Sequence, residues 1–184
     1  MPGSETSVDQ AFERCRLLAR LIEMEYERAR ANPTIQRYID LGIIQRGDKI
    51  GEARKQIDQV FGDLIALVDH LIILDMAAAL ERVFKLRIAT AVGEARKTLR
   101  AGHRSLVLAA REKLVREADD FEGLSDITKL IGADLSGEMQ QLLEKVRENR
   151  NRFAHGTDVR NVPTILGEDA RAALNEAVAL LQPV

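Results

Sequence analysis

The chain has 184 residues, which is enough for one domain with its own hydrophobic core and too few for two catalytic domains. Hydrophobic residues make up 46% and charged residues 30%, with four prolines and no tryptophan, a composition that indicates a globular helical protein and excludes a largely disordered one. The formal net charge of −2 argues against a protein that coats nucleic acid through bulk charge. Any contact with RNA or DNA must therefore be local.

The pattern of cysteine and apolar residues predicts a cytoplasmic protein without a membrane segment. Cys15 is the single cysteine, so it forms no internal disulfide, and its place on an apolar stripe indicates a core residue rather than a nucleophile. The first residues lack the basic and then apolar order of a secretory signal. The most apolar run, residues 64–80, is interrupted by Asp69, His70 and Asp75, so it falls short of the roughly 20 uninterrupted apolar residues of a membrane span.

The first 50 residues are interpreted as an N-terminal helical extension. Apolar residues recur every three or four positions over residues 8–30, which predicts an amphipathic helix that Asn32-Pro33 closes. A helical turn is expected over residues 34–41, ended by Gly42, and Gly47-Asp48 marks a second break.

Residues 51–184 are expected to form the main helical bundle. Since no proline occurs between residues 48 and 101, one or two long helices must lie there, with Gly62 and Gly93 as weak points. The main helix is placed at residues 63–99. Residues 64–68 are apolar all round, so this helix is expected to be central or to lie at a subunit interface, with nearly complete burial.

The last third of the chain predicts further helices separated by polar or glycine-containing breaks. One is expected over residues 105–118, and a short one capped by Ser125 ends at Gly132.

Ser136 is expected to cap a longer helix that reaches residue 154 or 155, where Gly156 stops it, and after a loop containing Pro163 a final helix covers residues 168–181. The sequence therefore predicts an all-α fold, a helical bundle with an N-terminal helical extension.

The helix that follows Ser136 carries the residues of most chemical interest. At about 100° per residue, Leu142, Leu143, Val146 and Phe153 form an apolar arc, and Arg150 points at its edge. Because an unpaired buried guanidinium is costly, Arg150 should face a carboxylate, a phosphate or a subunit interface. Asn151 and His155 are four residues apart and lie on the flank next to Arg150.

The run Arg-Asn-Arg-Phe-Ala-His from Arg150 to His155 resembles the signature of the HEPN superfamily, an arginine followed by a polar residue and, after four to six intervening residues, a histidine. Four residues separate the pair here, and Asn151 occupies the favoured polar position. A weaker resemblance covers residues 63–181, through a long helix containing Leu80-Glu81-Arg82-Val83-Phe84, the motif helix and a closing helix. The resemblance implies a HEPN-like four-helix core.

Active members of that superfamily are metal-independent endoribonucleases, so the resemblance implies RNA as the substrate and no cofactor. The ribose 2′-hydroxyl can attack the adjacent phosphate if the protein supplies proton transfer and stabilises the anion. His155 suits proton transfer at neutral pH, and Arg150 would hold the phosphate by bidentate hydrogen bonds. Asn151 would position either His155 or the phosphate.

The resemblance also implies a homodimer, because one motif supplies a single histidine and a two-fold axis would bring two motifs to one cleft. A role as a toxin or defence effector restrained by an antitoxin or other regulatory protein rests on the resemblance alone. Arg147, Arg152 and Arg160 are candidate RNA-binding residues. The alternative is that they are solvated charges beside acidic neighbours, namely Glu144, Glu148 and Asp158.

Other functions are weighed against this one. Metal binding is not expected, because neither His70 nor His103 has a carboxylate three residues before it. Residues 127–136 look like the first helix and turn of a helix-turn-helix, which would make residues 137–152 a DNA recognition helix. A third possibility is a catalytically inactive helical interaction module.

Overall fold

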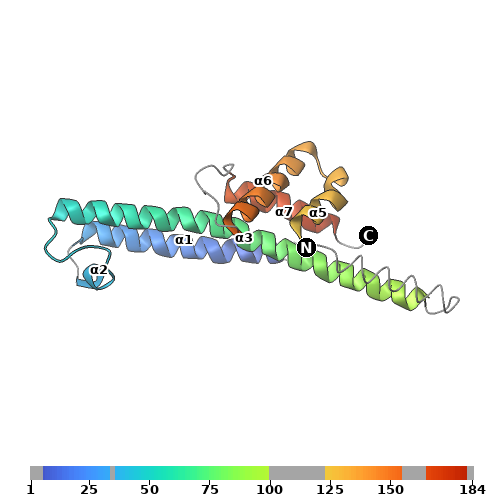
Figure 1. Cartoon of the computed structure of the whole chain (residues 1–184), viewed down its shortest axis with the longest axis horizontal. Coiled ribbons are helices and arrows are strands. Elements are labelled where there is room, and N and C mark those ends of the chain that lie inside the picture. Colours follow the sequence, from blue (N-terminus) through green and yellow to red (C-terminus); the bar gives the residue numbers. More distant parts are fainter. Residues whose placement is uncertain (1–5, 34–35, 100–122, 155–164, 182–184) are drawn as a thin grey trace, which may run out of the picture.

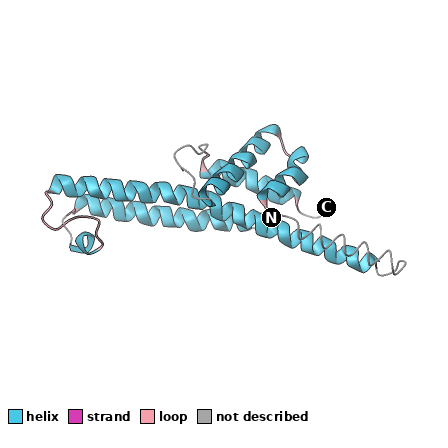
Figure 2. Ribbon diagram, viewed as in Figure 1, coloured by secondary structure: helices cyan, strands magenta, loops and turns pink. Residues whose placement is uncertain are grey.

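The computed structural model describes residues 6–33, 36–99, 123–154 and 165–181, and every regular element in these ranges is helical. Helix α1 (Ser7–Ala31) and helix α3 (Ile50–Leu99) lie side by side and antiparallel as a long hairpin, with the short helix α2 (Gln36–Asp40) beside the turn (Figure 1). Helices α5 (Leu124–Ile131), α6 (Gly137–Ala154) and α7 (Gly167–Leu180) pack together against the middle of α3. The predicted all-α helical bundle is confirmed (Figure 2).

Helix α1 begins and ends close to the predicted positions. Its N-terminus has a capping box in which the Thr6 side chain accepts the Asp9 N–H and the Asp9 carboxylate accepts the Thr6 N–H, both at 3.0 Å. Two glycines with positive φ, Gly42 at 70° and Gly47 at 96°, shape the connection to α3, a conformation that few other residues adopt without strain.

Helix α3 corrects the predicted start of the main helix. The helix begins at Ile50 and not near residue 63, and it passes through Gly62 without a break. A glycine inside a helix costs only about 1 kcal/mol, and packing of the preceding turns outweighs it. These turns place Ala53, Ile57 and Phe61 in a buried cluster at the α2 end of the hairpin.

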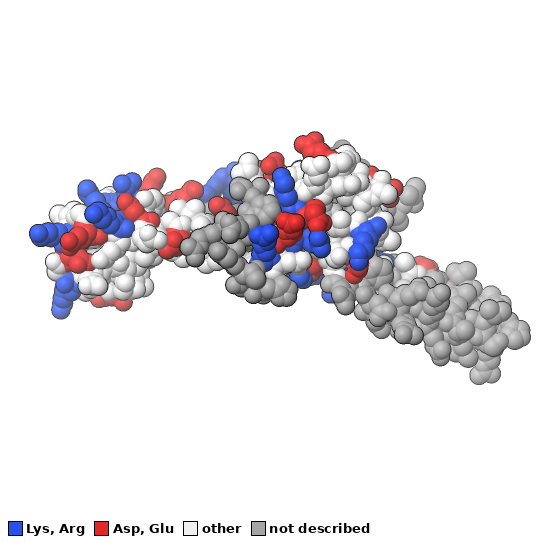
Figure 3. Space-filling model, turned by 45° about the horizontal axis from the view of Figure 1, so that its top comes forward, with Lys and Arg blue, Asp and Glu red and all other residues white. Residues whose placement is uncertain are grey.

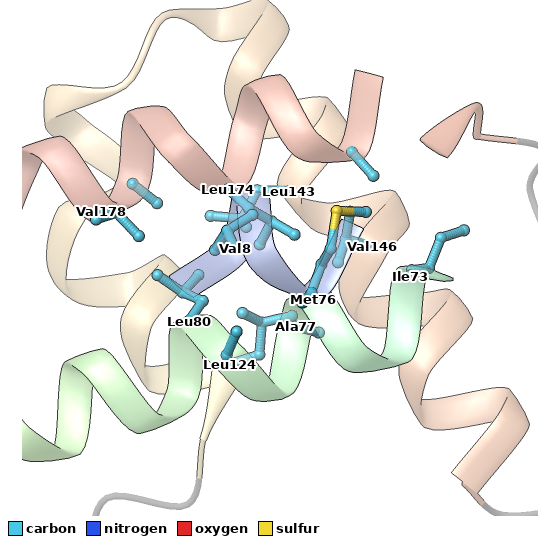
Figure 4. Close-up of a cluster of buried hydrophobic side chains, with 14 of the residues drawn as sticks. Val8, Ile73, Met76, Ala77, Leu80, Leu124, Leu143, Val146, Leu174 and Val178 are labelled. Carbon is cyan, nitrogen blue, oxygen red and sulfur yellow. The ribbon is translucent and has the colours of Figure 1, made fainter. Parts of the chain in front are cut away.

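The main core lies where α5, α6 and α7 meet the hairpin (Figure 4). Its side chains come from every helix except α2, including Val8, Met76, Leu80, Leu124, Leu143, Val146 and Leu174. The core therefore draws residues from both sides of position 50, since Val8, Ala11 and Phe12 of α1 belong to it. The division into an extension and a bundle stays a prediction.

Two further expectations about local structure are wrong. Burial of residues 64–68 is incomplete in the single chain, because Leu64 is 36% and Leu67 42% exposed. Ser125 does not cap α5, whose N-cap is Gly123 and whose first N–H, that of Leu124, is bonded to a side chain of α3 instead. The predicted helix over residues 105–118 lies outside the described residues.

Ser136 caps α6 as predicted, with its hydroxyl oxygen accepting the Met139 N–H at 3.3 Å. The final helix, α7, also matches its prediction to within a residue at each end, and it buries Ala170, Leu174 and Ala177.

Candidate active site

Arg150 lies near the C-terminal end of α6, on the side of the helix that faces α3. Leu143 and Val146, which precede it by two turns and one turn, are fully buried in the main core. Helical periodicity therefore directs Arg150 toward the margin of that core, where its side chain remains 33% exposed. The long arginine stem can lie along the apolar surface while the guanidinium reaches solvent.

The carboxylate partner of Arg150 is Glu81 of α3. The distance between Arg150 Nη2 and Glu81 Oε1 is 3.3 Å, and the Glu81 side chain is only 15% exposed. The same Oε1 accepts the backbone N–H of Leu124 at 3.2 Å, so Glu81 also satisfies a free donor at the start of α5. One carboxylate thus joins α3, α5 and α6.

Close packing at this junction explains Gly123. Its φ of 123° is one that residues with a side chain rarely adopt, and a Cβ built there would lie 2.8 Å from Glu81 Oε1. Glycine therefore allows the N-terminus of α5 to approach the carboxylate that holds Arg150.

Asn151 contacts Arg150 directly. Its Oδ1 accepts a hydrogen bond from Arg150 Nη1 at 3.2 Å, so the guanidinium lies between the Glu81 carboxylate and the Asn151 amide. The structure brings these two predicted site residues together. Two further predicted site residues, His155 and Arg160, lie outside the described residues.

The end of α6 is held against α3 by an aromatic contact. The rings of Phe153 and His70 are 5.8 Å apart between centroids and tilted by 34°. This contact and the Arg150–Glu81 pair fix two successive turns of α6. His155 is the second residue after Phe153 in the sequence.

Of the arginines proposed to guide RNA, the two that the structure describes, Arg147 and Arg152, are paired with a neighbouring group or only partly accessible. Arg147 donates from Nε to Glu144 Oε2 at 2.9 Å and makes a second contact with the same carboxylate, which raises the pKa of Arg147. Arg152 is half-buried on α6. The Arg147 pair agrees with the alternative in which these residues are surface charges.

Basic and acidic side chains alternate on the face of the molecule shown in Figure 3, without a large patch of one sign. This pattern agrees with the small net charge of the chain. Nucleic-acid contact, where it occurs, would rely on a few placed groups instead of a general positive field.

The helix-turn-helix interpretation has the expected order of elements, because the 3₁₀ turn η1 (Gly132–Asp134) separates α5 from α6. However, the exposed first turn of α6 carries Glu138, and Asp134 precedes it. These carboxylates would oppose the phosphates that flank a DNA groove.

Cys15, which was interpreted from the sequence as a core residue, packs at the edge of the main core. Cys15 is half-buried against the main core, and burial raises the pKa of its thiol, with the nearby Asp75 carboxylate adding to the effect. Within the described ranges, no three His, Cys, Asp or Glu side chains gather in a way that could hold a metal ion. No helix there is long and apolar enough to cross a bilayer.

Sequence reasoning missed one residue of the site. Glu81 was noted only as part of the long helix, and its pairing with Arg150 depends on tertiary packing. Asn149, which precedes Arg150, was not singled out either; it is 5% exposed, and its Nδ2 donates to the Lys145 carbonyl of the same helix at 2.9 Å.

A scan against protein-family models found no family that matches this chain, and searches of curated proteins and of solved structures found no match either. The candidate site therefore rests on the residues and geometry described above.

Proposed function

We propose that this protein is a metal-independent endoribonuclease of the HEPN type, in which Arg150 and His155 act on one phosphodiester. The resemblance of residues 150–155 to the superfamily signature supports the proposal. The same resemblance supports the further proposals of a homodimer and of a toxin or defence role under a regulatory partner, whereas the proposal of a cytoplasmic location rests on the single cysteine and the first residues of the sequence.

One observation carries the proposal furthest: two side chains orient the guanidinium of Arg150, and the Arg150 side chain as a whole is still one-third exposed. An arginine placed in this way can receive a phosphate, because the two acceptors that orient it leave part of its donor edge open. A phosphate would either replace Glu81 or bind beside it. In both cases the negative charge of the phosphate would meet the Arg150 cation, which lies five residues before His155 in the sequence.

In the proposed reaction the ribose 2′-oxygen attacks the adjacent phosphorus as its proton passes to a base. The bond from phosphorus to the 5′-oxygen breaks, and an acid protonates that oxygen. The products are a 2′,3′-cyclic phosphate and a 5′-hydroxyl. His155 of one copy and His155 of a second copy would serve as base and acid, while Arg150 stabilises the charge on the phosphoryl oxygens.

The proposal is tested by incubating purified protein with a mixed RNA pool in excess EDTA. Wild-type protein is expected to cleave, and Arg150→Ala and His155→Ala are expected to lower the rate by about 100-fold or more. Arg54→Ala is the matched control, because Arg54 is an exposed arginine near the far end of α3. Absence of cleavage by wild-type protein, or equal cleavage by all variants, would contradict the proposal.

A second candidate is favoured by the Arg150–Glu81 pair itself. This pair gives Arg150 a structural role without any substrate, as expected of an interaction module that joins α3, α5 and α6. If the protein is such a module, Arg150→Ala is expected to lower its stability. His155→Ala is then expected to leave stability unchanged, and neither the wild-type protein nor the variant is expected to cleave RNA.

A further inference from the structure

Helix α3 continues past the point where α1 begins. Arg14 of α1 pairs with Asp75 of α3 at 2.9 Å. Because the two helices are antiparallel, Ser7, the first residue of α1, lies at about the level of Arg82. Residues 82–99 of α3 therefore extend about 27 Å beyond the start of α1 (Figure 1). They are called the α3 arm.

The α3 arm is basic although the chain as a whole is acidic. Residues 82–99 hold five basic residues and a single acidic one, Glu94, so their net charge is +4. Since the whole chain has a net charge of −2, the other residues together carry −6. No acidic residue occurs between Glu81 and Glu94, and Glu94 itself pairs with Lys97 at 2.7 Å. The arm is therefore a local concentration of positive charge, of the kind that attracts a polyanion.

The cations near the start of the arm are not neutralised by the part of the chain that the structure describes. Arg82, Lys85 and Arg87 are exposed, and none of them forms an ion pair or a side-chain hydrogen bond there. Lys85 follows Glu81 by four residues, a spacing that favours an ion pair. However, the Glu81 carboxylate is engaged by Arg150 and by the first N–H of α5, so Lys85 stays available.

Arg82 and Lys85 lie on one side of the arm, next to the candidate active site. At about 100° per residue they are about 60° apart around the helix, and Lys85 lies about 40° from Glu81 and about 6 Å further along. Glu81 in turn holds Arg150 at 3.3 Å. The cations of Arg150, Arg82 and Lys85 therefore follow one another along α3. Arg87 points to the other side, about 140–160° from the other two cations of the arm.

This arrangement fits a flexible RNA strand better than a lipid surface. Exposed cations along a helix can contact the phosphates that repeat along a single strand. A helix that lies on a membrane needs instead a broad apolar face opposite its cations. Among the described side chains of the arm, Leu86 is the one large apolar group that is exposed, at 68%, and around the helix it lies between Arg82 and Arg87. One leucine flanked by cations does not form such a face.

We propose that Arg82 and Lys85 bind the backbone of single-stranded RNA and direct it along the α3 arm away from Arg150. The phosphate at Arg150 is the one that is cleaved, and phosphates next to it in the strand contact these two cations. The choice of RNA as the ligand rests on the proposed ribonuclease function. This route does not need Arg147, whose guanidinium is already held by Glu144.

Fluorescence anisotropy tests the proposal with a labelled single-stranded RNA of about 12 nucleotides, fully 2′-O-methylated so that it cannot be cleaved. Wild-type protein is expected to bind this RNA, and the double variant Arg82→Gln/Lys85→Gln is expected to raise its Kd by about tenfold. The slope of log K against log salt concentration should fall by about 1.4, because two phosphate contacts are lost.

The matched control is Arg54→Gln/Lys55→Gln, because Arg54 and Lys55 are an exposed basic pair near the other end of the same helix. This control is expected to leave both the Kd and the slope unchanged. Circular dichroism of each variant checks that the exposed substitutions leave the helices folded. Absence of RNA binding by wild-type protein, or equal losses in the two double variants, would overturn the proposal.

Two further variants separate the placement of the cations from their number. Arg82→Lys/Lys85→Arg keeps both charges and is expected to bind within about twofold of wild type. Arg87→Gln removes one charge from the other side of the arm and is expected to raise the Kd less than Lys85→Gln does. Equal effects of Arg87→Gln and Lys85→Gln would contradict the assignment of RNA to this side of α3.

Binding and cleavage measured together distinguish this proposal from the ribonuclease itself. On cleavable RNA, Arg82→Gln/Lys85→Gln is expected to raise KM and leave kcat unchanged. Binding that depends on the arm without any cleavage would contradict the ribonuclease alone, whereas cleavage with an unchanged KM in the double variant would contradict the role of the arm alone. Binding of wild-type protein to vesicles of phosphatidylcholine and phosphatidylserine, but not to RNA, would also overturn the proposal.

Discussion

Removal of the Glu81 carboxylate is expected to loosen the junction of α3, α5 and α6. The Arg150 pair, with one partner a third exposed, contributes about 1 kcal/mol or less, because solvent screens it. The hydrogen bond from the Leu124 N–H to a charged acceptor contributes about 1.5–3 kcal/mol. We therefore expect Glu81→Ala to lower the free energy of unfolding by about 2–3 kcal/mol, measured by urea unfolding followed by circular dichroism.

Glu81→Gln separates the two contributions, because its amide oxygen can still accept the Leu124 N–H while the charge is lost. It is expected to cost about 1 kcal/mol. Asp69→Ala is the control, as an exposed carboxylate on the same helix. A cost for Glu81→Ala no larger than that of Asp69→Ala would refute the reasoning. So would a double-mutant cycle in which the effects of Glu81→Gln and Arg150→Ala simply add.

Three further predictions concern the surroundings of the site and the core. Although burial raises the pKa of Asp9, hydrogen bonds from Asn175, Thr6 and Arg171 outweigh it and lower that pKa below its usual value. Its stabilisation is therefore present at neutral pH and lost as the pH falls below about 4, so Asp9→Asn should flatten the acid side of a stability–pH curve. Cys15 should react with iodoacetamide at neutral pH far more slowly in folded than in urea-unfolded protein, since burial raises its pKa; equal rates would contradict its place in the core. Gly123→Ala should lower the thermal midpoint by several degrees, because its Cβ would meet Glu81, and an unchanged midpoint would be the contrary result.

Much of the fold follows from local signals in the sequence. The three- and four-residue spacing of apolar residues predicted α1, α6 and α7, because burying one stripe requires that period. Ser136 was correctly predicted as the N-terminal cap of α6. The predicted start of α3 was wrong because Gly62 is a weak local signal that packing of the preceding turns overcomes.

The candidate site was only partly predictable. An arginine on the edge of a buried arc predicted that Arg150 needs a partner, and the structure supplies one. The identity of that partner as Glu81 could not be predicted, because α3 and α6 are far apart in sequence and only tertiary packing brings them together. The same carboxylate made Ser125 unnecessary as a cap for α5, which explains that wrong prediction.

The chemistry of the products gives the most direct test of the proposed function. A short RNA that the protein cleaves at one site would be compared, in excess EDTA, with the same RNA carrying a single 2′-deoxyribose before that site. The account predicts a 2′,3′-cyclic phosphate and a 5′-hydroxyl from the first RNA, dependent on Arg150 and His155, and no cleavage of the second. Cleavage of the deoxy-substituted RNA at the same position would contradict it.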